Sequence, residues 1–204
     1  MADMEMEEKK TYAEQIMQKV KEQQNQDGID YVNPENHIED GFIIIKYAKL
    51  ELEEKQIGDS GLRMVLPKSY SIMDEALAKK KYPDDDRPAY IYTSEDSTVN
   101  FTYSIEEGIV EENEIPELKN LILKEMKRLH PASEVEQDEL IETKGGKHCA
   151  VFGMEIPILD GSVYNASFFY AVSNGLLIGS FNCDASDKKQ WKPVLIEMLS
   201  TLEE

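Results

Sequence analysis

The chain has 204 residues, of which 41% are hydrophobic, enough for one sizeable core. Its 22 lysines and arginines against 41 aspartates and glutamates give a formal net charge of −19. A surface this acidic repels phosphate backbones and anionic lipids, so it argues against a nucleic-acid-binding or membrane-surface protein and favours a partner with a basic patch. The composition also excludes collagen-like, coiled-coil and disulfide-scaffold proteins.

The N-terminal sequence MADMEMEEKK has neither the basic start nor the apolar stretch of about 7–15 residues that a secretory signal needs. No window approaches the roughly 20 apolar residues of a membrane span. These observations predict a cytoplasmic protein without membrane insertion, unless a leader has been removed.

Residues 5–25 predict an amphipathic helix, because apolar side chains recur on one side with helical spacing. This apolar stripe comprises Tyr12, Ala13, Ile16, Met17 and Val20. The helix either packs against its own domain or docks another chain through Tyr12, Ile16 and Val20.

A polar segment over residues 24–41 contains glycine and proline, which is typical of a linker or long loop. Residues 42–54 (FIIIKYAKLELEE) begin with β-branched side chains and continue with alternating Leu and Glu, which indicates a strand with one exposed face. The domain could begin near residue 40 or near residue 57. We expect an N-terminal helix and linker over 1–40 and a single domain over 41–204.

The next elements are a strand over 61–67, a short helix over 74–81 and a loop over 82–88. A hairpin is expected over 88–107, with Thr93 opposite Thr98. One face of this hairpin then carries Tyr90, Tyr92, Val99, Phe101, Tyr103 and Ile105.

Two further helices are expected. The first spans residues 113–130, where Asn113 can cap it and Pro116 lies in the first turn. The second lies at the C-terminal end and begins near Pro193, after a turn that carries Trp191 as a core anchor.

Between these helices, the pairs Asp160-Gly161 and Asn174-Gly175 supply the positive φ angles of tight turns and predict a three-strand antiparallel meander. One face of the meander carries Val151, Phe168, Tyr170, Val172, Leu177 and Phe181. The other face carries Phe152, Met154, Ile156, Phe169, Ala171 and Ile178. Both faces are apolar, so both need a covering layer, which the amphipathic helices can provide.

Three phrases, GLRMVLPKSYSIM, RPAYIYTSEDSTVNFTYS and GLLIGSFNCDASDKKQWKP, together with this order of elements, resemble the PsbP-like superfamily. The resemblance covers residues 58–204, so the first 40–57 residues are additional. It implies an α+β fold, an antiparallel β-sheet covered by helices on both faces, here with an N-terminal helical extension. The superfamily includes photosystem PsbP proteins and Mog-type nuclear-import factors, most of which bind other proteins.

The sequence contains no recognisable catalytic, cofactor-binding or metal-binding motif. His37, His130 and His148 lie far apart, without zinc spacing. The predicted register places Cys149 and Cys183 six residues apart along the middle strand, about 20 Å, so two free thiols are expected.

We expect a non-enzymatic protein-interaction module with a chaperone, adaptor or immunity-type role. The acidic loop Asp84, Asp85, Asp86 and the Tyr12–Val20 stripe are its candidate partner-binding elements. The alternative is a small-molecule or lipid carrier with a pocket between sheet and helix, and an enzyme with a dispersed site comes third. The sequence leaves the oligomeric state open.

Overall fold

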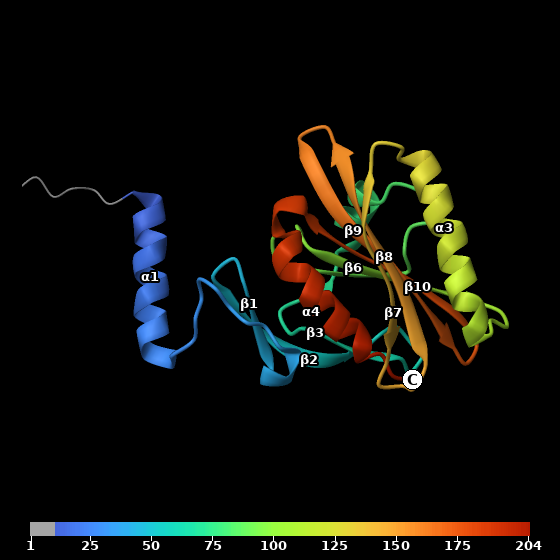
Figure 1. The fold of residues 1–204 in the computed structure, drawn as a ribbon, viewed down its shortest axis with the longest axis horizontal. Coiled ribbons are helices and arrows are strands. Elements are labelled where there is room, and N and C mark those ends of the chain that lie inside the picture. Colours follow the sequence, from blue (N-terminus) through green and yellow to red (C-terminus); the bar gives the residue numbers. More distant parts are fainter. Residues whose placement is uncertain (1–10) are drawn as a thin grey trace, which may run out of the picture.

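A computed structural model describes residues 11–204, which form two antiparallel sheets and four α-helices (Figure 1). Residues 5–10 of the predicted N-terminal helix lie outside the described residues. Within the described part, no helix combines the length and apolar character that crossing a bilayer requires.

The larger sheet has seven strands in the order β4-β5-β6-β10-β9-β8-β7, so the predicted meander β8-β9-β10 is confirmed. Its strands are β4 (Ser71–Ile72), β5 (Tyr90–Thr93), β6 (Asn100–Glu107), β7 (Glu134–Glu142), β8 (His148–Ile158), β9 (Gly161–Val172) and β10 (Gly175–Asp184). The short helix α2 (Glu75–Lys81) lies between β4 and β5, as the sequence predicts.

The predicted registers of the meander are wrong by two residues. Ile158 pairs with Gly161 and Val172 pairs with Gly175, so each turn lies one residue earlier than expected. Gly161 has a φ of 143°, which L side chains rarely adopt, and it therefore opens β9 instead of ending the turn. Because the shift is an even number of residues, every side chain stays on its predicted face.

The same even shift occurs in the β5–β6 hairpin, where Thr93 pairs with Asn100 instead of Thr98. Cys149 and Cys183 face Tyr170 and Tyr164, still six residues apart along β9, and both are buried free thiols, as predicted.

Helix α3 (Ile115–Leu129) covers one face of the large sheet. The buried cluster beneath it contains Ile115, Leu123, Ala150, Phe152, Met154, Phe169, Ala171 and Leu176. The predicted cap at Asn113 is wrong, because residues 112–114 form a 3-10 turn before the helix. Glu111 and Glu114 form a capping box, in which the side chain of each accepts a hydrogen bond from the backbone amide of the other. Lys119 is also buried and pairs with Asp138 of β7.

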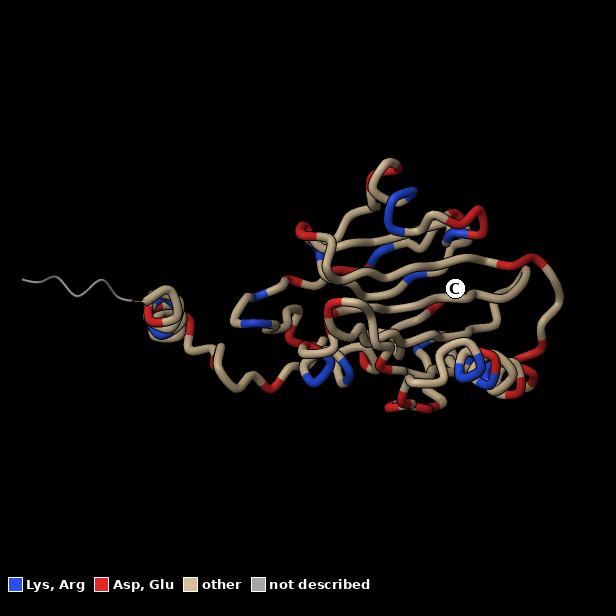
Figure 2. Tube along the Cα trace, turned by 90° about the horizontal axis from the view of Figure 1, so that it is seen from above, with Lys and Arg blue, Asp and Glu red and all other residues tan. Residues whose placement is uncertain are grey.

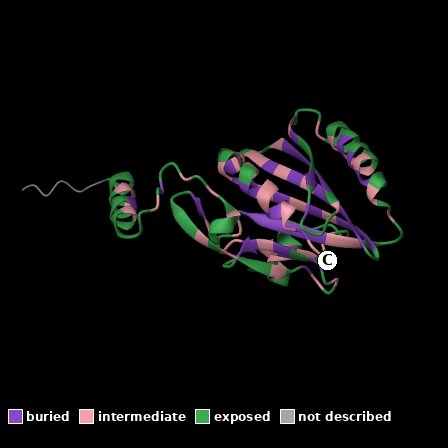
Figure 3. Cartoon of the chain, turned by 60° about the horizontal axis from the view of Figure 1, so that its bottom comes forward, coloured by how far each residue is buried: buried purple, intermediate pink, exposed green. Residues whose placement is uncertain are grey.

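The opposite face is covered by helix α4 (Lys188–Ser200) together with a second, three-stranded sheet. This small sheet consists of β1 (Phe42–Ile45), β2 (Ala48–Gln56) and β3 (Arg63–Pro67). Figure 3 shows the buried residues concentrated between these layers. The two sheets therefore share one core with α4, and the antiparallel sheet is covered on both faces, as predicted.

Helix α4 begins five residues before Pro193, earlier than predicted. A proline inside a helix removes one backbone hydrogen bond. The extra turn buries Trp191 against Tyr70 and Phe181, whose ring centroids lie 6.4 and 5.3 Å from it, and this packing offsets the loss.

The turn between β1 and β2 has no counterpart in the sequence prediction, which treats residues 42–54 as one strand. Lys46 and Tyr47 occupy left-handed backbone conformations, with φ of 50° and 63°. Non-glycine residues adopt this region at a cost, so neighbouring contacts must hold it. Gln190 accepts a hydrogen bond from the Lys46 amide at 2.9 Å, and Asp187 pairs with its ammonium group at 2.6 Å.

Helix α1 (Tyr12–Asp27) stands at one end of the molecule, beyond the small sheet (Figure 1). A capping box between Thr11 and Glu14 begins it, and Gly28 ends it with a φ of 74°. Val20 and Tyr31 are buried and pack against Ile44, on the face of β1 that points away from the main core.

Strand β7 is one edge of the large sheet. Its sequence, EVEQDELIE, is rich in acids, and its register shifts between Val135 and Gln137. Charges and bulges are the usual means by which proteins protect an edge strand from pairing with another chain.

Candidate functional site

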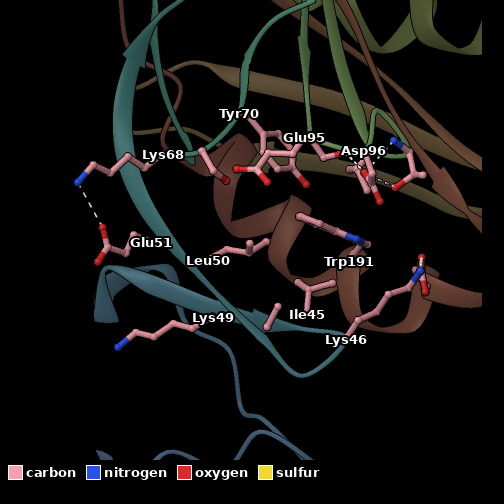
Figure 4. A pocket seen from close by; sticks show the side chains of 16 residues that line it. Ile45, Lys46, Lys49, Leu50, Glu51, Lys68, Tyr70, Glu95, Asp96 and Trp191 are labelled. Carbon is pink, nitrogen blue, oxygen red and sulfur yellow. Dashed lines mark hydrogen bonds and ion pairs between the residues drawn. The ribbon is translucent and has the colours of Figure 1, made fainter. Parts of the chain in front are cut away.

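A cleft of about 750 Å³ opens between the small sheet, the β5–β6 loop and the start of α4 (Figure 4). Elements far apart in the chain contribute to it: Ile45 and Leu50 come from β1 and β2, Val99 ends the β5–β6 loop, and Trp191 lies on α4. This volume is typical of small-molecule and cofactor sites.

Strand alternation explains the wall formed by β2. Leu50 packs toward the shared core, whereas the neighbouring Lys49 lies on the other face, with its ammonium 4.0 Å from the Phe42 ring centroid. The floor is aromatic, because Tyr70, which follows β3, meets Trp191 there. Trp191 is 1% exposed, and its indole nitrogen is buried without a hydrogen-bond partner.

The β5–β6 loop forms the opposite wall and is fixed by Asp96. The Asp96 carboxylate accepts hydrogen bonds from the Ser94 hydroxyl at 2.6 Å and from the amide and hydroxyl of Thr98 at 3.1 and 2.8 Å. These hydrogen bonds lower the pKa of Asp96, and the one from Ser94 has the largest effect. The loop thereby holds the neighbouring exposed Glu95 at the cleft, without a partner among the residues that the structure describes.

Two ion pairs close the ends of the cleft. Lys46 pairs with the largely buried Asp187, and this hydrogen bond raises the pKa of Lys46. Lys68 pairs with Glu51 at 3.3 Å, with both side chains exposed. The other rim lysine, Lys49, lies over an aromatic ring.

Three ionisable groups of the cleft, Asp96, Lys46 and Tyr70, have shifted pKa values. A general acid or base works best with a pKa near the working pH. Here the pKa of Asp96 is lowered, that of Lys46 is raised, and burial raises that of Tyr70. All three pKa values move away from neutrality, so each of these three groups keeps one charge state at neutral pH.

The residues that the sequence singled out lie elsewhere. The loop Asp84–Asp86 is exposed between α2 and β5 and does not line the cleft. Figure 2 shows that other acids are likewise spread over many loops. On α1, Tyr12 is 79% exposed, Ile16 is partly buried, and Val20 is buried against its own chain.

The sequence suggested a pocket between sheet and helix only as an alternative and did not identify the residues of this cleft, which come from segments spread between positions 45 and 191. Trp191 was singled out, but only as a core anchor, and the structure places it in the core and in the cleft wall together.

Comparisons with known proteins are limited to structure, because no family model and no curated protein matches the sequence. The solution structure of cyanobacterial PsbP (CyanoP) from Synechocystis is similar with a TM-score of 0.54 at 12% identity, covering 74% of this chain and 91% of that one. The yeast Ran-binding protein Mog1p has a TM-score of 0.49 at 12% identity, covering 76% of this chain and 95% of that one. LpqN of Mycobacterium tuberculosis, involved in cell envelope biogenesis, has a TM-score of 0.44 at 11% identity, covering 84% and 100%.

The layers described above define an α+β sandwich in which helices and a small sheet enclose a larger antiparallel sheet. The chain has a PsbP-like fold.

Proposed function

We propose that this protein is a non-enzymatic interaction module that holds a segment of another polypeptide in the cleft. The observation that carries the proposal is the cleft itself, with an aromatic and aliphatic floor and a rim that bears charges of both signs. Burial of apolar side chains supplies affinity in such sites, and the surrounding charges select the partner.

The charged groups that fix the walls of the cleft fit a binding role: Asp96 holds the β5–β6 loop, and Lys46 pairs with Asp187. The net charge of −19 favours a basic protein partner over nucleic acid or an anionic membrane, and it fits a role in the cytoplasm.

The acidic loop Asp84–Asp86 is proposed as a second, weaker element of the same interaction. It lies outside the cleft and is exposed, so its contribution is to attract a basic partner during diffusion. Charges of this kind change the association rate more than the lifetime of a complex. The exposed end of α1, at Tyr12, is proposed as a further contact for a partner already held.

The experiment uses Trp191, the only tryptophan in the chain, as a reporter of the cleft. A displayed library of random 12-residue peptides is panned against the full chain, and recovered peptides are titrated while tryptophan emission is recorded. Leu50→Glu places a charge on the cleft wall and should weaken binding at least tenfold. The matched control Leu121→Glu changes an exposed position of α3 and should leave affinity unchanged.

Circular dichroism and the melting temperature of both variants show whether the fold is kept. Peptides that bind wild type and Leu50→Glu equally well would contradict the use of the cleft.

A small-molecule carrier is the second candidate, because the volume and the Tyr70–Trp191 floor also suit an apolar ligand. Native mass spectrometry of the protein purified from its own cell would detect such a ligand. Its displacement by Leu50→Glu, together with failure of the peptide panning, would favour the carrier.

A further inference from the structure

The buried indole nitrogen of Trp191 is a hydrogen-bond donor without an acceptor. It belongs to a side chain that is 1% exposed and that lines the cleft. Buried donors in native proteins are almost always paired, because an unpaired one loses its hydrogen bonds to water. An acceptor oxygen from a ligand could pair with this nitrogen once the side chains that bury it move apart.

A second unmatched group lies on the opposite wall. Figure 4 shows Trp191 between the loop that carries Glu95 and the strands that carry Leu50 and Ile45. The nearby carboxylates of Asp96 and Asp187 are engaged with the loop and with Lys46. Glu95 is exposed and has no ion-pair partner within residues 11–204. A cationic group on a ligand would supply the missing ion-pair partner of Glu95.

The charge around the cleft selects against an anionic ligand such as a fatty acid. Its carboxylate could accept from Trp191, but it would approach Glu95 and Asp96, while Lys46 and Lys68 are already paired and Lys49 lies over the Phe42 ring. The overall charge of −19 repels it further. A peptide offers the same acceptor oxygen without a charge, in its backbone carbonyl.

We propose that the cleft binds an extended polypeptide segment in which an apolar side chain is flanked by lysine or arginine. The apolar side chain packs against Leu50 and Val99, a backbone carbonyl accepts from Trp191 Nε1–H, and the basic side chain pairs with Glu95. This inference rests on the proposed function and gives it a ligand chemistry.

The test uses a fluorescein-labelled, blocked heptapeptide with one leucine flanked by two lysines in a glycine–serine background. Fluorescence anisotropy measures its affinity for the full chain. Two matched peptides replace both lysines by glutamate or the leucine by serine. The first peptide should bind saturably with a dissociation constant below about 1 mM. Each matched peptide should have a dissociation constant at least ten times larger.

Two protein variants test the two polar contacts. Glu95→Lys should lower the affinity for the lysine–leucine peptide at least tenfold. Its control, Glu107→Lys, makes the same change of net charge at an exposed position at the other end of β6 and should change affinity less than twofold. Trp191→Phe keeps an aromatic ring and removes the N–H donor, and should weaken binding about threefold to tenfold. Circular dichroism confirms that each variant is folded.

Equal binding of the lysine and glutamate peptides, or an unchanged affinity for Glu95→Lys or Trp191→Phe, would overturn the inference. So would the absence of saturable binding. Library peptides that are sensitive to Leu50→Glu but carry no basic residue would overturn the inference while leaving the proposed function in place.

Discussion

Phe168 and Gly179 form a cross-strand pair in the middle of the large sheet, and they should respond to substitution as one unit. Phe168 is 0% exposed, and its ring lies 5.8 Å from that of Tyr103 in an edge-to-face arrangement. Gly179 is paired to both residues, one on each side. A Cβ at Gly179 would lie 2.2 Å from the Phe168 ring, so the glycine provides the space in which the two rings meet.

The magnitudes follow from this geometry. Phe168→Ala leaves a cavity in the core and should lower the free energy of unfolding by about 3–5 kcal/mol. Gly179→Ala forces the ring to move and should cost about 1–3 kcal/mol. In the double variant, the new methyl group enters the space that the ring has left, so the loss should not exceed that of Phe168→Ala alone. The coupling free energy between the two sites should therefore be about 1–3 kcal/mol.

Guanidinium unfolding followed by circular dichroism measures all four proteins, and Trp191 emission provides a second probe of two-state behaviour. Losses that add within about 0.5 kcal/mol in the double variant would refute the reasoning, because they would show that the ring does not lie over Gly179.

Asp138→Asn should destabilise the protein by about 1–3 kcal/mol because it removes the negative charge that compensates the buried Lys119, whereas Lys119→Met should be nearly neutral in the same denaturant titration. Burial raises the pKa of Cys149 and of Cys183 to about 12, so iodoacetamide at pH 8 should modify neither thiol until the chain is unfolded. Because the unfolded thiols ionise at lower pH than the buried ones, the free energy of unfolding should also fall as pH rises above about 9 toward 12, which alkaline unfolding curves can check. Neutralising Asp84–Asp86 together should slow association with a captured partner but shift the melting temperature by less than about 2 °C, and an association rate indifferent to this change and to salt would contradict the steering role.

Alternation along the strands carries enough information to place side chains on faces, but not to fix the pairing register. Both turns of the meander have the dipeptides that tight turns prefer, yet Gly161 serves as the first residue of β9 and not as part of the turn. A shift of one residue would have moved Phe168 and Phe169 to the wrong layers, so burial forbids it. A shift of two residues keeps every side chain on the same face of the sheet, and the hydrophobic pattern therefore cannot exclude it.

The small sheet and the cleft depend on tertiary contacts that local patterns do not encode. The turn at Lys46 and Tyr47 lacks the glycine or asparagine by which such turns are recognised, and contacts from Asp187 and Gln190, some 140 positions away, hold it. Since this turn creates the wall opposite the β5–β6 loop, the position and lining of the cleft could not be predicted either. Likewise, the pairing of the buried Lys119 with Asp138 of β7 is a tertiary contact that the local pattern does not reveal.

The acidic edge strand β7 has a consequence for how copies of this protein behave in concentrated solution. Neighbouring strands in a sheet lie about 4.8 Å apart. At 0.1 M salt the Debye length is about 10 Å, so the β7 carboxylates without a lysine partner in the chain from Thr11 onward, Glu134, Glu139 and Glu142, repel their counterparts on a second β7 edge, whereas at 1 M it is about 3 Å. The repulsion is then screened at the spacing where backbone hydrogen bonds form. High ionic strength should thus promote edge-to-edge assembly, and dilute buffers should keep the molecules apart.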